Sequence, residues 1–380
     1  MCVINYLVEN PFYGILVALG GVWFIQLYFY LFYYIRVVFY KNNSKVKQEK
    51  EGVSVIICAK NEEENLKQFL PSVLEQDYPN YEVIVVNDCS VDGTESVIRD
   101  LQKKYTHLRT TNLNQDDKFF HGKKLALTVG IKAAANDQLL FTDADCKVVS
   151  SKWIEKMQAK FTDKSEIVLA YGGYFPEKKL INNLIRFDTL FTAIQYFAFS
   201  LARKTYMGVG RNLAYRKSLF FKNKGFAKHH HLYSGYDDLF VSQAATKRNV
   251  RVEISPDSVT RSRSEQTFLQ WLKQKKRHLT TSKLYKFSSK WRLFLENSSR
   301  IAFYVLFVLS LILFKEYYIY ILAAFLFRTI VQLIVFKVAM KRLNEKFLLL
   351  PSLLYDILMP FLSLLFLLAN KFSRKKNQWK

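Results

Sequence analysis

Cysteine is scarce in this chain and follows no disulfide or metal-binding pattern. Four cysteines occur in 380 residues, far apart and without a CxxC pair (Cys2, Cys58, Cys89 and Cys146). This excludes a disulfide-stapled scaffold and a zinc ribbon. Three of them fall at or just past the end of a predicted strand, which favours buried, reduced thiols in a reducing compartment.

Acidic residues are also few relative to basic ones. The chain has 32 Asp and Glu against 56 Lys and Arg, a formal net charge of +24. Such an excess indicates polyanionic partners: anionic lipid, phosphorylated substrates or nucleic acid. No zinc spacing and no aromatic-basic RNA-binding motif occurs, and the basic residues concentrate beside apolar segments. We therefore expect membrane lipid and phosphorylated partners, and no nucleic acid.

Charge is absent from residues 11–35. This run exceeds the ~20 residues that a helix needs to span a bilayer. A cleaved signal peptide is the alternative, but no basic residue precedes the run and no small-residue cleavage site follows it. Four lysines follow instead: Lys41, Lys45, Lys47 and Lys50. The pattern predicts a transmembrane helix within residues 1–40 and places the following region in the cytoplasm, at the cell (inner) membrane.

The C-terminal third is apolar again, with candidate helices at 301–314 and 317–336. A third stretch, 347–370, contains Pro351, Asp356 and Pro360. A simple third span would place the basic tail, residues 371–380, outside the cell, against the charge rule. We expect a re-entrant hairpin there, within a membrane region 301–370. Residues 264–300 are predicted to form amphipathic helices at the membrane surface, because 271–300 contains nine Lys or Arg and one Glu.

Between these segments, short apolar strands alternate with helical patterns. Strands are predicted at Val53–Cys58, Glu82–Asn87 and Gln138–Thr142, and helices at 62–76, 92–104 and 122–135. This alternation predicts an α/β domain, residues 50–263, with a mostly parallel sheet flanked by helices. Ligands collect at the carboxyl ends of such strands. Three polar clusters follow the strands: Lys60, Asn61 and Glu62; Asp88; and Asp143-Ala144-Asp145.

The Asp143 and Asp145 pair is the central chemical signal. Two carboxylates one residue apart after a strand can both reach a hard cation, Mg²⁺ or Mn²⁺, that is shared with substrate phosphates. The ordinary alternative is a solvated turn. Asp88 is placed to accept hydrogen bonds from a nucleobase or ribose, and its alternative is a βα turn in which Asp92 or Thr94 caps the next helix.

At this point the sequence resembles a known family. The segments Val53–Glu62, Val85–Thr94 and Phe141–Asp145 resemble family 2 glycosyltransferases in order and spacing, and the resemblance covers roughly residues 50–285. It implies a GT-A fold, a nucleotide-sugar donor and inversion at the anomeric carbon. The membrane segments make the chain similar to the cellulose- and hyaluronan-synthase-like and lipid-glycosylating members.

The resemblance also implies roles for single residues. Lys60, Asn61 and Glu62 match the first-strand nucleoside contact, and Asp88 matches the base-binding aspartate. Lys123, in His121-Gly122-Lys123, matches an element near the diphosphate, and Asp143 and Asp145 match the diphosphate and metal pair. Gly208, Gly210 and Asn212 match the loop that lines the acceptor site. The ordinary alternatives are a solvated helix face for Lys123 and a plain turn for the glycines.

An inverting transfer needs a carboxylate that takes the acceptor proton. The family places this base in an acidic pair at the position of Asp237 and Asp238. Because Tyr236 precedes them where the family has an acid, the register is ambiguous; we predict Asp237, with Asp238 as runner-up. The alternative is that one of the two caps the following helix.

The segment Gln274-Lys275-Lys276-Arg277-His278 resembles the Gln-x-x-Arg-Trp element of polymerising members, with His278 in place of Trp. Gln274 is thereby an acceptor candidate and Arg277 a diphosphate candidate. The missing Trp argues against processive synthesis.

The sequence thus predicts an inverting glycosyltransferase of cell-envelope glycan synthesis. It would move a sugar, UDP-linked as the family resemblance implies, to a lipid-linked or membrane-proximal glycan acceptor. A processive polysaccharide synthase is the first alternative. A non-catalytic basic scaffold that binds anionic lipid is the alternative from another class. A nucleotidyltransferase fits poorly, because the loop after the first strand is acidic at Glu62, Glu63 and Glu64.

Overall fold

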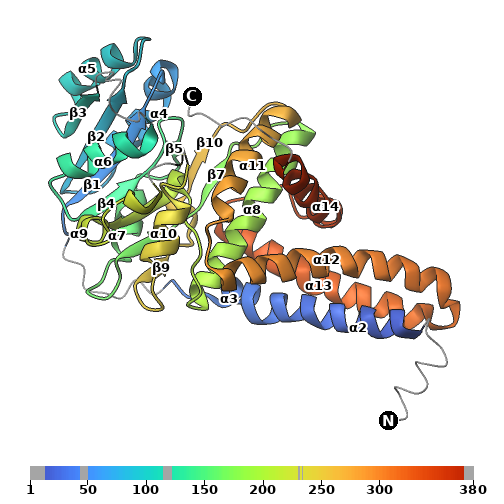
Figure 1. Ribbon diagram of the computed structural model, residues 1–380. Helices are drawn as coiled ribbons and strands as arrows, with labels where there is room; N and C mark the ends of the chain where they lie inside the picture. Colours follow the sequence, from blue (N-terminus) through green and yellow to red (C-terminus); the bar gives the residue numbers. More distant parts are fainter. Residues whose placement is uncertain (1–12, 43–49, 114–121, 230–231, 233, 372–380) are drawn as a thin grey trace.

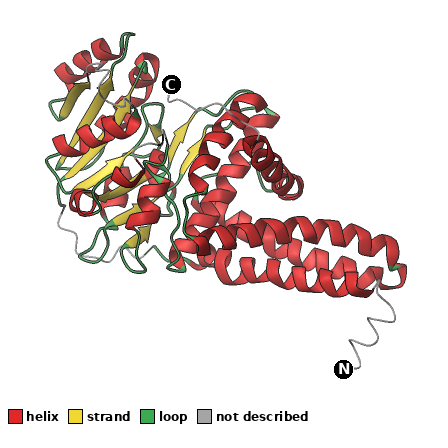
Figure 2. Ribbon diagram, viewed as in Figure 1, coloured by secondary structure: helices red, strands yellow, loops and turns green. Residues whose placement is uncertain are grey.

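A computed structural model describes residues 13–42, 50–113, 122–229, 232 and 234–371. Lys45, Lys47, His121 and the basic tail from residue 372 lie outside the described residues, as do residues 1–12. The described chain has two parts, an α/β body that contains the sheets and a long helical arm that extends from it (Figure 1, Figure 2).

The body is built on a seven-stranded sheet in the order β3-β2-β1-β4-β8-β6-β9. Its strands are β1 (Val53–Ala59), β2 (Tyr81–Asp88), β3 (Leu108–Leu113), β4 (Gln138–Phe141), β6 (Ile167–Leu169), β8 (Leu213–Arg216) and β9 (Val250–Val252). All neighbours pair in parallel except β8, which is antiparallel to β4 and β6. The predicted mixed, mostly parallel sheet is therefore confirmed.

Helices cover both faces of this sheet and bury its central strands on both sides. All seven residues of β1 are buried. The covering helices include α4 (Glu63–Leu74), α5 (Thr94–Lys104), α6 (Lys123–Ala133), α7 (Trp153–Gln158), α9 (Lys217–Lys222) and α10 (Asp238–Ala244). Helix α6 lies so close to β1 and β2 that a Cβ at Gly130 would meet Ile56 at 2.7 Å and Val86 at 2.9 Å. Glycine thus permits this packing.

A second, three-stranded sheet joins the body to the arm. Its strands are β5 (Lys147–Val148), β10 (Thr260–Ser262) and β7 (Gly172–Tyr174), in the order β5-β10-β7. The long helix α8 (Leu180–Leu201) follows β7, and α11 (Phe268–Ser282) follows β10. The two helices lie between the sheets and the arm (Figure 1).

Four helices in the described residues are long and apolar enough to cross a membrane. The first runs from Tyr13 to Phe39 and comprises α2 (Tyr13–Tyr28), a π-helical segment (Phe29–Tyr34) and α3 (Ile35–Phe39). The others are α12 (Phe287–Leu313), α13 (Tyr318–Arg342) and α14 (Pro351–Lys371). Helices α2, α12 and α13 lie side by side in the arm (Figure 1).

Two sequence predictions about the arm are wrong. Helix α12 begins at Phe287, so the boundary predicted at residue 300 is wrong, because residues on both sides of it belong to one helix. Of the charged residues on which the predicted surface segment 264–300 rested, Glu296 and Arg300 are buried inside the bundle. The position of the rest of this segment at a membrane surface stays a prediction.

The predicted hairpin in 347–370 is also wrong, because the segment forms one continuous helix, α14. Pro351 occupies its first position, where a missing N–H is tolerated, and Pro360 lies inside the helix without ending it. Asp356 does not break the helix either. Its carboxylate is fully buried and meets Arg300 at 3.1 Å and Arg328 at 2.8 Å.

Candidate active site

The loops after β1 and β2 form one side of the catalytic edge and are bonded to each other. The backbone N–H of Asn61 donates to Ser90 Oγ at 3.0 Å, and the N–H of Val91 donates to Asn61 Oδ1 at 2.9 Å. Glu62 N–H donates to Thr94 Oγ1 at 2.9 Å. Asn61 has a φ of 56°, a left-handed conformation that asparagine tolerates better than most residues. Asn61 therefore fixes the shape of both loops.

The predicted nucleoside residues lie together at this edge. Asp88 ends β2 and is 1% exposed, Lys60 directly follows β1, and Glu62 is partly buried beside the loop of Asp88. Burial raises the pKa of Glu62, and the charges of Asp145 and Asp143 raise it further. Because β1 and β4 are neighbouring parallel strands, the loops that follow them lie at the same edge of the sheet. The nucleoside roles themselves stay predictions.

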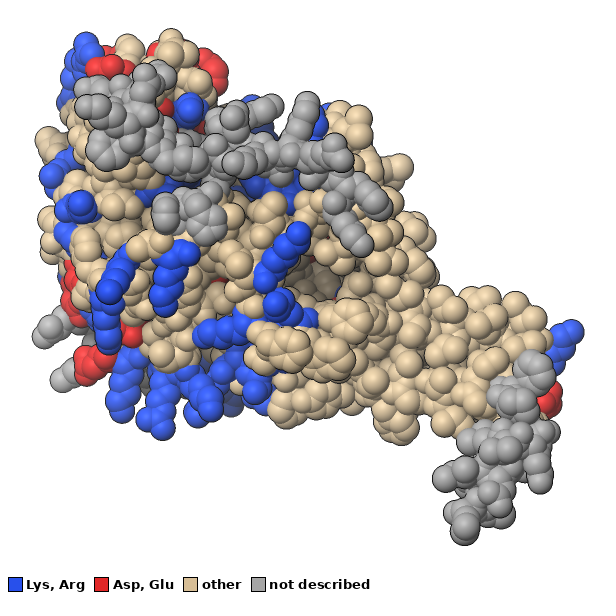
Figure 3. All heavy atoms as spheres, in the orientation of Figure 1, with Lys and Arg blue, Asp and Glu red and all other residues tan. Residues whose placement is uncertain are grey.

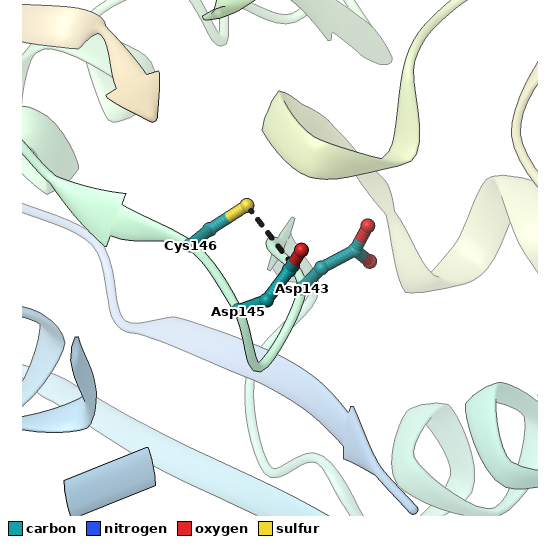
Figure 4. Close-up of side chains that lie close together, drawn as sticks. All are labelled: Asp143, Asp145 and Cys146. Carbon is teal, nitrogen blue, oxygen red and sulfur yellow. Dashed lines mark hydrogen bonds between the residues drawn. The ribbon is translucent and has the colours of Figure 1, made fainter. Parts of the chain in front are cut away.

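The turn after β4 brings three side chains together. The ligand atoms of Asp143, Asp145 and Cys146 all lie within 4.8 Å of one another. Figure 4 shows them on a single turn, with the Cys146 thiol directed at the Asp145 carboxylate, 3.6 Å away. Burial, and then the neighbouring Asp143 charge, raises the pKa of Asp145. A bound cation would relieve this repulsion.

The chemistry of this turn fits a hard divalent cation. Burial raises the pKa of the Cys146 thiol well above its usual range, so the sulfur stays protonated and is a poor ligand. Two carboxylates then remain as donors, and oxygen donors are those that Mg²⁺ and Mn²⁺ prefer. Two protein ligands leave coordination positions for the phosphates of a substrate.

Lys123 supplies a cation directly opposite Asp143. It begins α6, forms an ion pair with Asp143 and donates to the Tyr236 hydroxyl at 3.0 Å. Although burial alone would lower it, the pKa of Lys123 is raised well above its usual range by Asp143 and Tyr236. Lys123 therefore remains charged and lies where the leaving diphosphate was predicted.

Arg211 is a site residue that the sequence reasoning missed. Its guanidinium stacks on the Tyr174 ring, 4.2 Å from the centroid, and donates to Ser262 Oγ at 3.2 Å. Burial alone would lower the pKa of Arg211, but Tyr174, Cys146 and Asp145 raise it. The available signal was its place between Gly210 and Asn212, as the one cation in the loop predicted to line the acceptor site.

The predicted base lies beside this loop. The backbone N–H of Gly210 donates to Asp237 Oδ2 at 2.8 Å, and Asp237 also caps α10 by accepting from the N–H of Asp238 at 2.9 Å. Burial raises the pKa of Asp237 above its usual value, although the two hydrogen bonds lower it. A Cβ at Gly210 would lie 2.5 Å from the Tyr236 ring, so the ring can cover the loop only because residue 210 is glycine.

Asp238 has a different environment. It is 6% exposed, and its Oδ2 accepts from the hydroxyls of Thr281 and Tyr285, the latter at 2.7 Å. Burial and the Asp237 charge raise the pKa of Asp238 to about 6. These contacts tie α10 to the end of α11. Asp237 is partly exposed and is the more accessible of the pair, which supports the predicted ranking without testing it.

The predicted acceptor residues lie in different surroundings. Gln274 donates to the Tyr174 hydroxyl at 3.4 Å and so reaches the ring on which Arg211 stacks. Arg277, the predicted diphosphate contact, is partly exposed on the same helix, α11. Gly208 is buried against Val241.

Asn212 requires a correction. Its side chain is 0% exposed. The amide nitrogen donates to the backbone oxygens of Tyr171 at 2.8 Å and Ser258 at 2.6 Å, and the amide oxygen accepts from the Trp153 indole N–H at 3.0 Å. The side chain therefore holds the loop in place from beneath and has no accessible atom for an acceptor.

Family comparison agrees with this geometry. The sequence model of "Glycosyl transferase family group 2" matches residues 142–369, and that of "Glycosyl transferase family 2" matches residues 54–222. The first match spans more than half of the chain, so the protein belongs to this family and is a family 2 glycosyltransferase. The non-catalytic scaffold is thereby disfavoured.

A solved structure shows the same fold over nearly the whole chain. The mannosyltransferase PcManGT from Pyrobaculum calidifontis, in complex with GDP-Man and Mn²⁺, superposes with a TM-score of 0.61 at 18% identity. The match covers 95% of this chain and 99% of that one. At this identity the likeness establishes the GT-A fold alone.

Curated relatives match over shorter lengths. The chain is 33% identical over 153 residues to poly-beta-1,6-N-acetyl-D-glucosamine synthase of Staphylococcus epidermidis, covering 38% of this chain and 33% of that protein. It is 37% identical over 106 residues to glycosyltransferase AglE of Haloferax volcanii, covering 27% and 33%. The matches thus span about a third of each of these relatives.

Proposed function

We propose that the protein transfers a sugar from a nucleotide-sugar, with inversion, to an acceptor at the membrane. The observation that carries this proposal is the meeting at one sheet edge of Asp88, the Asp143 and Asp145 pair, and Asp237. These groups match the three needs of the reaction: a nucleoside contact, a diphosphate site and a base. The donor would be UDP-linked, as the family resemblance implies.

The chemical step follows from the positions of the charged groups. Asp237 accepts the proton of the acceptor hydroxyl as its oxygen attacks the anomeric carbon, and the bond from that carbon to the diphosphate breaks. Lys123 and Arg211 flank the Asp143 and Asp145 turn, where they stabilise the negative charge that develops on the leaving group. Asp143 and Asp145 would hold Mg²⁺ or Mn²⁺, which supplies further neutralisation of the diphosphate when bound.

The membrane setting restricts the acceptor. Four helices of spanning length adjoin the catalytic body, and α11, which bears Gln274 and Arg277, lies between the body and α14. This supports a lipid-linked or membrane-proximal glycan acceptor, with the body on the cytoplasmic side of the inner membrane. Labelling of an introduced cysteine near Lys152 from outside intact cells would contradict that side.

The test is a transfer assay on membranes that contain the full chain. A panel of radiolabelled nucleotide-sugars is supplied with and without Mg²⁺ or Mn²⁺, and transfer into the lipid-extractable or glycan fraction is measured. We expect one donor to give label that depends on the cation and is absent with Asp237→Asn. Full transfer in excess chelator would contradict the metal role.

A processive polysaccharide synthase is the second candidate, favoured by the local identity to the S. epidermidis synthase. The presence of His278, exposed on α11, in place of the tryptophan of polymerising members argues against it. Product length separates the two, since single transfer gives one added sugar and processive transfer gives a ladder or a polymer.

A further inference from the structure

A cavity lies away from the catalytic edge, where the first candidate span meets the body. It has a volume of about 430 Å³ and is lined by residues at the end of α8, at the start of β9 and just after α3. The residues before β6 and β9 lie at the amino ends of these strands. Since both strands run parallel to β1 and β4, the cavity opens at the sheet edge opposite the catalytic one.

Among the described residues that line this cavity, every charged side chain is a lysine or an arginine. These cations come from three segments and are all exposed: Lys164, Arg203, Lys247, Arg248 and Arg251. Figure 3 shows Lys and Arg side chains gathered on the lower side of the body, next to the start of the helical arm. No lining carboxylate offsets them, so the cavity is suited to an anion.

Hydroxyl groups complete the lining. Thr246 Oγ1 already accepts the N–H groups of Arg248 and Asn249, so its own proton is free to donate outward. Ser200 is 8% exposed, and its buried Oγ has no hydrogen-bond partner among the described residues. A buried hydroxyl without a partner costs free energy, which an oxygen-rich ligand in the cavity would recover.

The position of the cavity relative to the spans indicates the source of the anion. Tyr40 lines it, directly after the candidate span Tyr13–Phe39, and the Tyr40 hydroxyl donates to Val252 O at 2.9 Å. Beside it, Arg342 at the end of α13 donates to Val38 O at 2.9 Å. Two candidate spans therefore end at the level of the cavity, which is the level at which lipid headgroups would surround helices that cross a bilayer.

We infer that this cavity binds the phosphate headgroup of an anionic membrane lipid, with Ser200 and the surrounding cations as its ligands. Such a site would fix the body against the membrane on the side away from the catalytic edge. The inference does not depend on the sugar or on the acceptor.

The test measures the thermal midpoint of the full chain in a neutral detergent during titration with short-chain phosphatidylglycerol, phosphatidylcholine or inorganic phosphate. We expect phosphatidylglycerol alone to raise the midpoint to a plateau. A triple Gln variant at Arg203, Lys247 and Arg248 should need at least ~10-fold more of it for half-saturation, because each basic residue near an anionic surface contributes to lipid affinity.

Two further variants separate a built site from general charge. Ser200→Ala keeps every cation and should still weaken binding of phosphatidylglycerol. A matched triple Gln variant at Lys103, Lys104 and Lys132 removes the same charge near β3, at the other end of the strand order, and should bind as the wild type does. Equal weakening by both triple variants, equal plateaus with phosphatidylglycerol and inorganic phosphate, or an unchanged Ser200→Ala variant would overturn the inference.

Discussion

The helical arm and the catalytic edge both bury charged residues, but they do so in opposite ways. Where the arm packs against α14, Glu296 and Asp356 face Arg300 and Arg328, and each carboxylate meets a guanidinium within 3.1 Å. At the catalytic edge, burial and then the charges of Asp145 and Asp143 raise the pKa of Glu62, and burial and then the charge of Asp143 raise the pKa of Asp145. Within that site, Lys123 forms an ion pair with Asp143.

This difference distinguishes charged residues that stabilise the fold from charged residues that are suited to bind a ligand. A buried pair with matched charges needs no further partner, and its loss leaves an isolated charge. A cluster with surplus carboxylates is unfavourable by itself, and it is retained where a cation or a proton completes it. We therefore expect substitutions in the arm to change stability and substitutions at the edge to change turnover.

The largest expected effect is on turnover, at the Asp143 and Asp145 turn. Asp143→Ala or Asp145→Ala should reduce transfer at least ~10³-fold, because the leaving diphosphate loses its main charge stabilisation. Turnover is measured in the membrane transfer assay, and the thermal midpoint is measured in parallel. Normal turnover in either variant would contradict the metal site, and a collapsed midpoint would contradict the comparison with the arm.

The converse substitution is Asp356→Ala, where the arm packs against α14. It leaves Arg328 and Arg300 without a shared carboxylate and should cost about 3–5 kcal/mol of stability, the usual loss when one partner of a buried pair is removed. Turnover per folded molecule should stay close to that of the wild type. Asp100→Ala, which breaks an exposed pair with Lys103, is the control and should leave the midpoint unchanged.

The third prediction distinguishes the two aspartates of α10. Asp237→Asn should lower turnover at least ~10²-fold while donor affinity is kept, because the base acts on the acceptor side. Asp238→Asn should cost less, through weaker contacts to Thr281 and Tyr285 that position α10. The reverse order would make Asp238 the base, and mild effects from both would require another carboxylate.

The sequence predicted the catalytic body well because local patterns decide it. The β-branched strands, the acidic turns and their order along the chain are sufficient for a mostly parallel sheet with its ligands at one edge. Arg211 was missed because its role depends on Tyr174 and Ser262, which are distant in the sequence and adjacent only after folding. Asn212 was misassigned for the same reason, since its partners Trp153 and Ser258 lie far along the chain.

The membrane helices were harder to predict, because a charged residue or a proline within an apolar segment is taken as a sign that the helix ends there. Arg300, Arg328 and Asp356 each argue against a membrane helix when taken alone. Together with Glu296 they form a neutral cluster that no single segment reveals. The hairpin prediction for 347–370 failed at this point, as did the boundary at residue 300.

The smallest expected effect is on stability, and it comes from the negative charge of Asp145 beside Asp143. Burial and the Asp143 charge raise the pKa of Asp145 in the folded protein, so the fold binds that proton more tightly than the unfolded chain does. A raised carboxyl pKa favours the fold below the unfolded value and weakens it as pH rises through the folded value. With chelator present, Asp145→Asn should therefore have a higher thermal midpoint than the wild type at neutral pH. The difference should shrink as pH falls and vanish below the ordinary aspartate pKa of about 3.9. A gain that is independent of pH would reflect packing of the amide, and a loss at neutral pH would mean that the Asp145 charge already has its partner within the fold.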